Sequence, residues 1–214
     1  MIQVKKIILN PFQENTYILY DQTAEAVIID PGCYSQSDID EVKWFVDANG
    51  LTVKYLILTH GHIDHILGLE ALKKIYKVES LAHADDIPLI ETSTKQALLF
   101  GLKFELAPKI DKCIKDSDHI SFGKSIIEVI HTPGHSMGGV CFFLRDENII
   151  FTGDTLFNGS IGRTDFMGGS HETLINSITQ KILPLGDNNV VYPGHGNSTT
   201  IEFEKKNNPF LMKS

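Results

Sequence analysis

The chain has 214 residues, of which 42% are hydrophobic and 21% are charged, the balance of a globular protein with its own core. A formal net charge of −8 argues against nucleic acid as a partner, because phosphate binding requires a basic surface. No segment approaches the roughly 18 apolar residues that span a bilayer, and no secretory signal is found at the start. We expect one cytoplasmic domain over residues 1–214, with a small molecule as its partner and no membrane.

The three cysteines do not form a framework. Cys33, Cys113 and Cys141 are odd in number and far apart in the chain, a usage that favours a reducing compartment over a set of disulfides. None of them is needed as a nucleophile by the motifs described below. We therefore interpret all three as packing residues.

The first quarter of the chain alternates apolar runs with turn residues. The runs predict strands over 2–9, 16–20 and 26–29, and then a helix over 39–48 that Asp38 caps. Asp30 directly follows the third strand and precedes Pro31-Gly32. Proline and glycine stop the strand there, so Asp30 is either a turn former or a residue that faces the sheet edge.

A fourth apolar run, over 55–58, leads into a histidine-rich stretch. The stretch reads Thr59-His60-Gly61-His62-Ile63-Asp64-His65, and a helix is predicted over 66–76. In an extended chain the side chains of His60 and His62, which flank Gly61, would project to the same side of the chain. Imidazole and carboxylate are ligands that Zn²⁺ prefers. Three histidines and one aspartate within six residues predict a metal site rather than a polar loop.

The second half of the chain repeats this logic after a less regular middle. Residues 79–86 suggest a strand and a short helix, and 90–107 show no clean period. Further strands are predicted over 125–130, 140–144, 149–151 and 190–192, with helices over 171–183 and 201–207. His135, Asp154 and His195 each follow a predicted strand, on a turn that contains glycine. Strand ends gather at one edge of a sheet, so we expect these three residues to join the first cluster.

The ordered series of these residues resembles the motif series of the metallo-β-lactamase superfamily. The resemblance extends from residues 15–17, through Asp30, to residues 208–210. It implies an α+β fold of the αββα sandwich type, in which two mixed sheets are flanked by helices. It also implies two divalent metal ions: Zn²⁺ first, with Fe²⁺ or Mn²⁺ as alternatives. The implied ligands are His60, His62 and His135 for one ion and Asp64, His65 and His195 for the other, with Asp154 bridging both.

Within the superfamily, residues 152–157 and 208–211 are most similar to the glyoxalase II group, the hydroxyacylglutathione hydrolases. The chain resembles the short bacterial members, since no C-terminal helical domain follows. This implies hydrolysis of a thioester such as S-lactoylglutathione by a metal-bound hydroxide, with Asp64 and Asp154 as catalytic residues. Antibiotic hydrolysis is not expected, because the cysteine ligand and the export signal of class B β-lactamases are missing.

Three alternatives stay open. Residues 162–166 are similar to a segment of the persulfide dioxygenases, a mononuclear iron branch, although Gly194 and Gly196 around the last histidine favour the hydrolases. The substrate could instead be another small ester or lactone, or the fold could be retained for binding alone.

Arg163, one of only two arginines, resembles a basic residue that glyoxalase II enzymes use near glutathione. It either binds a substrate carboxylate bidentately or braces its loop through Asp165.

Overall fold

The computed structural model describes residues 1–212, which form two six-stranded sheets packed face to face. The first sheet has the order β1 (Gln3–Leu9), β2 (Glu14–Tyr20), β3 (Glu25–Ile29), β4 (Thr52–Ile57), β5 (Glu79–His83) and β6 (Lys112–Ile114). The second has the order β14 (Thr199–Thr200), β13 (Val190–Pro193), β10 (Ile149–Gly153), β9 (Val140–Leu144), β8 (Ser125–His131) and β7 (His119–Phe122). Both sheets mix parallel and antiparallel pairs.

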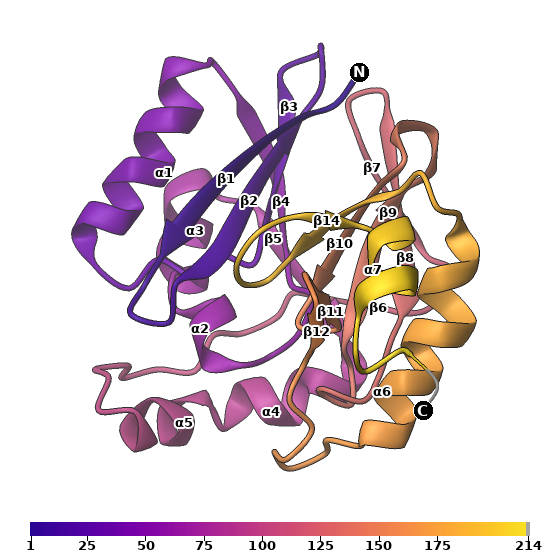
Figure 1. The fold of residues 1–214 in the computed structure, drawn as a ribbon. Coiled ribbons are helices and arrows are strands. Elements are labelled where there is room, and N and C mark those ends of the chain that lie inside the picture. The colour runs from indigo at the N-terminus through magenta and orange to yellow at the C-terminus, as the bar shows by residue number, and fades with distance from the viewer. Residues whose placement is uncertain (213–214) are drawn as a thin grey trace.

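Helices cover the outer faces of both sheets (Figure 1). On the first sheet these are α1 (Gln36–Ala48) and α3 (Leu69–Tyr76), and on the second α6 (His171–Ser177) and α7 (Ile201–Asn207). The parallel pairs β3–β4 and β4–β5 need these crossovers, because a tight turn cannot join parallel strands. The predicted αββα sandwich with two mixed sheets is therefore confirmed.

Three apolar layers hold the sandwich together. The central layer lies between the sheets and includes Leu19, Ile57, Phe142 and Phe151, each no more than 1% exposed. Two outer layers join each sheet to its helices. Strands that face two layers contain long apolar runs, as in β9, where all five residues are apolar and buried. A strand covered on both faces has no solvated side to alternate with, which explains the continuous apolar runs in the sequence.

Several predicted boundaries were wrong. Ser35, not Asp38, is the N-cap of α1, and Asp38 is the third helical residue of a capping box with it. The predicted helix over 66–76 is divided into α2 (Ile63–Ile66) and α3, because the chain at Gly68 lies directly against Cys33 and Pro31. The helix predicted over 171–183 is α-helical only to Ser177, and a π-helical turn, η3 (Ile178–Ile182), and a 3₁₀ turn, η4 (Leu183–Leu185), continue it.

Residues 79–86 form the predicted strand and short helix, β5 and η1 (Ala84–Asp86). The elements that sequence patterns left undefined are α4 (Ile87–Glu91), α5 (Ser93–Leu99), β6 and β7, and the second half adds η2 (Arg145–Glu147), β11 (Leu156–Phe157) and β12 (Ser160–Ile161). Cys33 and Cys141 are buried as predicted, but Cys113 is exposed, because it lies on the short edge strand β6. Within residues 1–212, no helix combines the length and apolar character that crossing a membrane requires.

Candidate metal centre

The seven predicted ligands converge at one edge of the sandwich. His60 follows β4, and Asp154 and His195 follow the parallel strands β10 and β13. His135 follows β8, which runs in the same direction as β10, since both are antiparallel to β9. The carboxyl ends of these strands therefore deliver residues from both halves of the chain to the same place.

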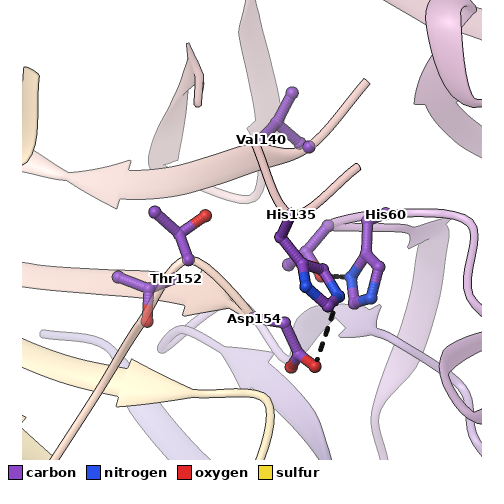
Figure 2. Close-up of a pocket in the computed structure, with 8 residues that line it drawn as sticks. His60, His135, Val140, Thr152 and Asp154 are labelled. Atoms are coloured by element: carbon purple, nitrogen blue, oxygen red, sulfur yellow. Dashed lines mark hydrogen bonds and ion pairs between the residues drawn. The ribbon is translucent and has the colours of Figure 1, made fainter. Parts of the chain in front are cut away.

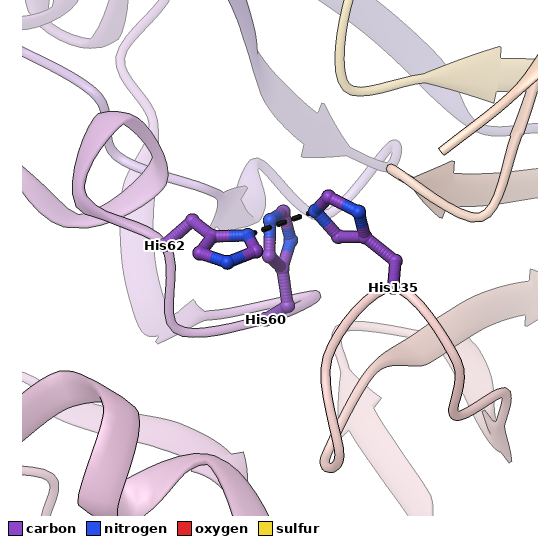
Figure 3. Close-up of side chains that lie close together, drawn as sticks. All are labelled: His60, His62 and His135. Carbon is purple, nitrogen blue, oxygen red and sulfur yellow. Dashed lines mark hydrogen bonds between the residues drawn. The ribbon is translucent and has the colours of Figure 1, made fainter. Parts of the chain in front are cut away.

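Three histidines form the first group (Figure 3). The rings of His60, His62 and His135 lie edge to face, with ring centroids 4.5–4.8 Å apart. His62 Nδ1 lies 2.8 Å from His135 Nε2. His60 and His135 are buried, at 3% and 5% exposure. One nitrogen from each ring points into a shared space, as three ligands of one ion would.

A carboxylate and two histidines form the second group, Asp64, His65 and His195. Asp64 Oδ2 lies 3.2 Å from His195 Nε2 and 3.6 Å from His65 Nε2. Asp64 and His65 belong to the short helix α2, which turns the chain so that both side chains face the loop after β13. This group has the donor chemistry that a second divalent ion requires.

Asp154 lies between the two groups. Its Oδ1 is 3.5 Å from His65 Nε2, and its Oδ2 is 3.5 Å from His135 Nε2 and 3.7 Å from His195 Nε2. Figure 2 shows its carboxylate directed toward His135 and His60. A Cβ atom on Gly194 would clash with Asp154 Oδ1, so only glycine lets the loop after β13 approach this closely. The carboxylate is placed to contact ions in both groups.

Unpaired atoms show that the site fits cations. His60 Nε2, His65 Nε2 and Asp154 Oδ1 are buried and have no hydrogen-bond partner within residues 1–212. Buried polar atoms in folded proteins are nearly always paired, and leaving one unpaired costs about 1–3 kcal/mol. All three atoms are electron-pair donors at the same edge. Two divalent ions, one in each group, would satisfy these atoms, which no proton donor within residues 1–212 does.

Hydrogen bonds outside the two groups orient two of the histidines. Asp30 Oδ2 accepts the Thr59 hydroxyl at 2.6 Å and His65 Nδ1–H at 3.0 Å. Because Thr59 donates its only hydroxyl proton to Asp30, its oxygen accepts from His60 Nδ1, 3.1 Å away. Both histidines therefore turn Nε2 toward the site. Asp30 orients these ligands, so it is more than a turn former.

Burial sets the protonation of the first group. It lowers the pKa of His62 to about 3, assisted by the adjacent His135, and it lowers the pKa of His60 well below its usual value. For Asp154, burial alone would raise the pKa, but the neighbouring His65 outweighs it and holds the pKa well below the ordinary range. At neutral pH, His60 and His62 are therefore neutral imidazoles and Asp154 is an ionised carboxylate, the forms that bind metal. For His65, burial alone would lower the pKa, but the carboxylates of Asp64, Asp154 and Asp30 outweigh it and raise the pKa well above its usual value.

Comparison with known proteins agrees with this geometry. The sequence model of the Metallo-beta-lactamase superfamily matches residues 9–195. The chain belongs to the metallo-β-lactamase superfamily. A hydroxyacylglutathione hydrolase, GloC, of Haemophilus influenzae is 38% identical over 98% of both chains. Among solved structures, the B3 metallo-β-lactamase BLEG-1 matches with a TM-score of 0.91 and 37% identity, over 99% of this chain and 100% of that one. TTHA1623, solved in a di-iron-bound form, matches with a TM-score of 0.87 and 33% identity, over 97% and 100%.

As a member of the metallo-β-lactamase superfamily, the chain is a metal-dependent hydrolase. The His and Asp groups account for divalent ions as its cofactors. The di-iron neighbour leaves the identity of the ions open between zinc and iron.

Asp86 is a residue of this site that the sequence did not reveal. Its Oδ2 accepts the Gly61 N–H and the Ser136 hydroxyl, both at 2.8 Å, and its Oδ1 accepts the Gly138 N–H at 2.6 Å. The carboxylate is only 1% exposed. It therefore joins the loop that carries His60 and His62 to the loop around His135. In the sequence Asp86 is only the second aspartate of an ordinary Asp-Asp pair, so no local signal marks it.

Strand β2 holds the loop that carries His195. Asn15 Nδ2 donates to the carbonyls of Pro193 and Gly196, at 2.9 and 3.0 Å, and the Tyr17 hydroxyl donates to Pro193 at 2.7 Å. The Asn15 N–H also donates to the Gly194 carbonyl at 2.7 Å. These bonds connect the first sheet to the last loop of the second. They fix the position of His195 in the metal centre.

The guanidinium of Arg163 is exposed and is paired with a carboxylate of its own loop. It makes two parallel hydrogen bonds to Asp165, at 2.9 and 2.8 Å, and lies 4.4 Å from the centre of the Phe166 ring. Its backbone carbonyl accepts His135 Nδ1–H at 2.7 Å, so the main chain of Arg163 orients a ligand. The side-chain geometry is that of a loop brace, and a substrate role for Arg163 stays a prediction.

A third compact group, at His83, Asp85 and His131, differs from the metal centre. The two rings stack at 4.2 Å, and their nitrogens already make hydrogen bonds. His83 Nδ1 accepts the Asp85 N–H, and His131 Nε2 lies 3.0 Å from the Met137 carbonyl. This group lacks the unpaired buried atoms of the centre. His83 is therefore an ordinary histidine.

Proposed function

We propose that the chain hydrolyses a small thioester, of which S-lactoylglutathione is the reference example, at a dinuclear metal centre. The observation that carries the proposal is the position of Asp154, whose carboxylate reaches histidines of both three-residue groups. A site for one ion would not need the second group. The 38% identity with a hydroxyacylglutathione hydrolase over almost the full length supports the choice of a thioester.

The residues of the chain divide the work of the site. His60, His62 and His135 would hold one ion, and Asp64, His65 and His195 the other, with Asp154 shared. Two divalent ions held by these residues would lower the pKa of a bound water toward neutral and would polarise a carbonyl. Hydrogen bonds of Asp30, Thr59 and Asp86 hold the ligands in position. Asp64, on the rim and close to His195, is placed to accept a proton from a water and to orient it. Zn²⁺ is the first choice of ion, and Fe²⁺ or Mn²⁺ suits the same donors.

The proposal is tested by adding S-lactoylglutathione to protein reconstituted with zinc and, separately, with iron. We expect free thiol to be released without oxygen uptake. In parallel, glutathione persulfide is offered to the iron form in an oxygen electrode. Faster oxygen uptake than thioester hydrolysis would replace the proposal with the persulfide dioxygenase alternative, which residues 162–166 suggest.

A second candidate is hydrolysis of a β-lactam. The observation in its favour is the TM-score of 0.91 with a B3 metallo-β-lactamase. A cyclic amide would need the same water and the same polarised carbonyl as a thioester. The same zinc preparation is therefore assayed with a chromogenic cephalosporin. We expect a kcat/KM well below that for the thioester, and the opposite order would make β-lactams the better substrate class.

A further inference from the structure

A cleft of about 300 Å³ opens beside the metal centre. One wall is formed by β1 and the turn after it, and the other by the loop after β13. Its lining residues are Lys6, Ile8, Phe12, Gln13, His195, Gly196 and Asn197. Because His195 belongs both to this lining and to the second ligand group, a molecule in the cleft lies next to the metal centre.

The alternation of side chains along β1 places Lys6 in this cleft. Ile7 and Leu9 pack in the outer layer beneath α1, and Lys5 lies on the same side, 5.5 Å from the centre of the Phe45 ring. Val4 points the other way, into the layer between the sheets. Lys6 and Ile8 continue that inward row beyond the end of the central layer. They line the cleft at the mouth of the sandwich.

The ammonium group of Lys6 is held in place but not neutralised. Its Nζ donates to the Gly196 carbonyl at 3.1 Å, which uses one of its three hydrogens and leaves two for a ligand. Within residues 1–212 no carboxylate forms an ion pair with it, whereas Lys54, elsewhere on the same sheet, pairs with Glu25. Beside it, Ile8 is 57% exposed. The cleft therefore combines a free positive charge with an apolar wall.

We propose that Lys6 is a substrate-binding residue that holds a carboxylate on the thiol half of the thioester. This inference rests on the proposed thioester hydrolysis, in which a lactoyl group carries no negative charge and the thiol half carries the anion. The cleft of about 300 Å³ has room for a small carboxylated thiol, or for one end of a longer one.

Lys6 takes the role that the sequence suggested for Arg163. The guanidinium of Arg163 already has a carboxylate partner in Asp165, and both side chains are 66% exposed. A substrate carboxylate would have to displace Asp165 from it. Within residues 1–212 Lys6 has no carboxylate to displace, and it lines the same cleft as His195. In a chain with a net charge of −8, such an unpaired cation is the feature that attracts an anionic substrate.

The test compares the S-lactoyl thioesters of N-acetylcysteine and of N-acetylcysteinamide, which differ only in a carboxylate and a neutral amide. Zinc-reconstituted wild type is compared with Lys6→Met, Lys6→Arg and Lys5→Met. We expect wild type to prefer the carboxylate in kcat/KM, and Lys6→Met to lower the acid-to-amide ratio on the order of tenfold. Lys6→Arg should restore most of the ratio. Lys5→Met, the matched change one residue away, should keep it. A purely structural bond to Gly196 would affect both thioesters equally.

A second readout needs no turnover. Calorimetry measures binding of the free thiols, N-acetylcysteine and its amide, to the same zinc-loaded proteins. If the thioesters are cleaved but the acid-to-amide ratio is the same in wild type and Lys6→Met, the Lys6 assignment is overturned and the proposed function stands. If they are not cleaved but Lys6→Met weakens binding of the acid thiol alone, the function is wrong and the Lys6 subsite stands. No cleavage and no effect of Lys6 on binding would overturn both.

Discussion

Replacing Asp86 by asparagine should loosen the metal centre without removing any ligand. The carboxylate accepts three hydrogen bonds, from Gly61, Gly138 and Ser136. An asparagine has nearly the same shape, but one of its two terminal atoms is a donor. Whichever way the amide is turned, its NH₂ faces the N–H of Gly61 or of Gly138, and one buried donor loses its partner.

The magnitude follows from these contacts. An unsatisfied buried donor costs about 1–3 kcal/mol, and relief of the desolvated charge offsets part of this. We expect Asp86→Asn to lower the free energy of unfolding by about 2 kcal/mol, which lowers the Tm of a chain of this size by about 4–8 °C. Because Gly61 separates His60 from His62, we also expect metal affinity to fall by about 10–100-fold, as for other residues that orient ligands.

Calorimetry of the metal-free protein and competition with a chelator measure the two effects separately. Asp85→Asn is the matched control, since its side chain is adjacent but 55% exposed, and it should change the free energy of unfolding by less than about 0.5 kcal/mol. If Asp86→Asn has the same Tm and the same chelator competition as Asp85→Asn, Asp86 does not organise the ligand loops.

Three other predictions concern single residues. Asp154→Ala should reduce the metal content, measured by elemental analysis, from two ions per chain to at most one, and two retained ions would contradict the shared-ligand role. Arg163→Ala should lower the Tm while kcat/KM for S-lactoylglutathione stays within about twofold, because the guanidinium is already hydrogen-bonded to Asp165. A large rise in KM at unchanged Tm would instead identify Arg163 as a substrate-binding residue. For Asp21, burial alone would raise the pKa, but hydrogen bonds from Thr23, Lys124 and Ser125 lower it from 3.8 to about 2. A carboxylate with a lowered pKa stabilises the fold at pH values above its unfolded-state pKa, and this stabilisation is lost as the pH falls through its folded-state pKa. Asp21→Asn should therefore flatten the profile of Tm against pH between about pH 4 and pH 2. A profile parallel to that of wild type would refute this.

The sequence was sufficient to predict that the ligand residues converge, because four of them follow strands. His60, His135, Asp154 and His195 stand on glycine-containing turns after apolar runs, and strands that run in one direction bring their ends to one edge. Local patterns were less reliable where packing decides the outcome. The break at Gly68 depends on the approach of Cys33, and the exposure of Cys113 depends on the edge position of β6.

Asp86 and Lys6 could not be identified from the sequence for a related reason. Asp86 acts through Gly138, 52 residues away along the chain, and Lys6 through Gly196, 190 residues away. No spacing rule connects such positions. Only the packed sheets bring them together, so their roles follow from the tertiary structure and not from a motif.

The mixed origin of the two ligand groups has a consequence for the assembly of the fold. Each group draws two donors from residues 60–65 and one from beyond residue 130, so either ion would fasten the first sheet to the second. An ion that binds the folded chain stabilises it in proportion to the logarithm of its free concentration. The connection between the two sheets at this edge would then depend on the free metal concentration. A chelator would weaken this connection and leave the packing of the apolar layers unchanged.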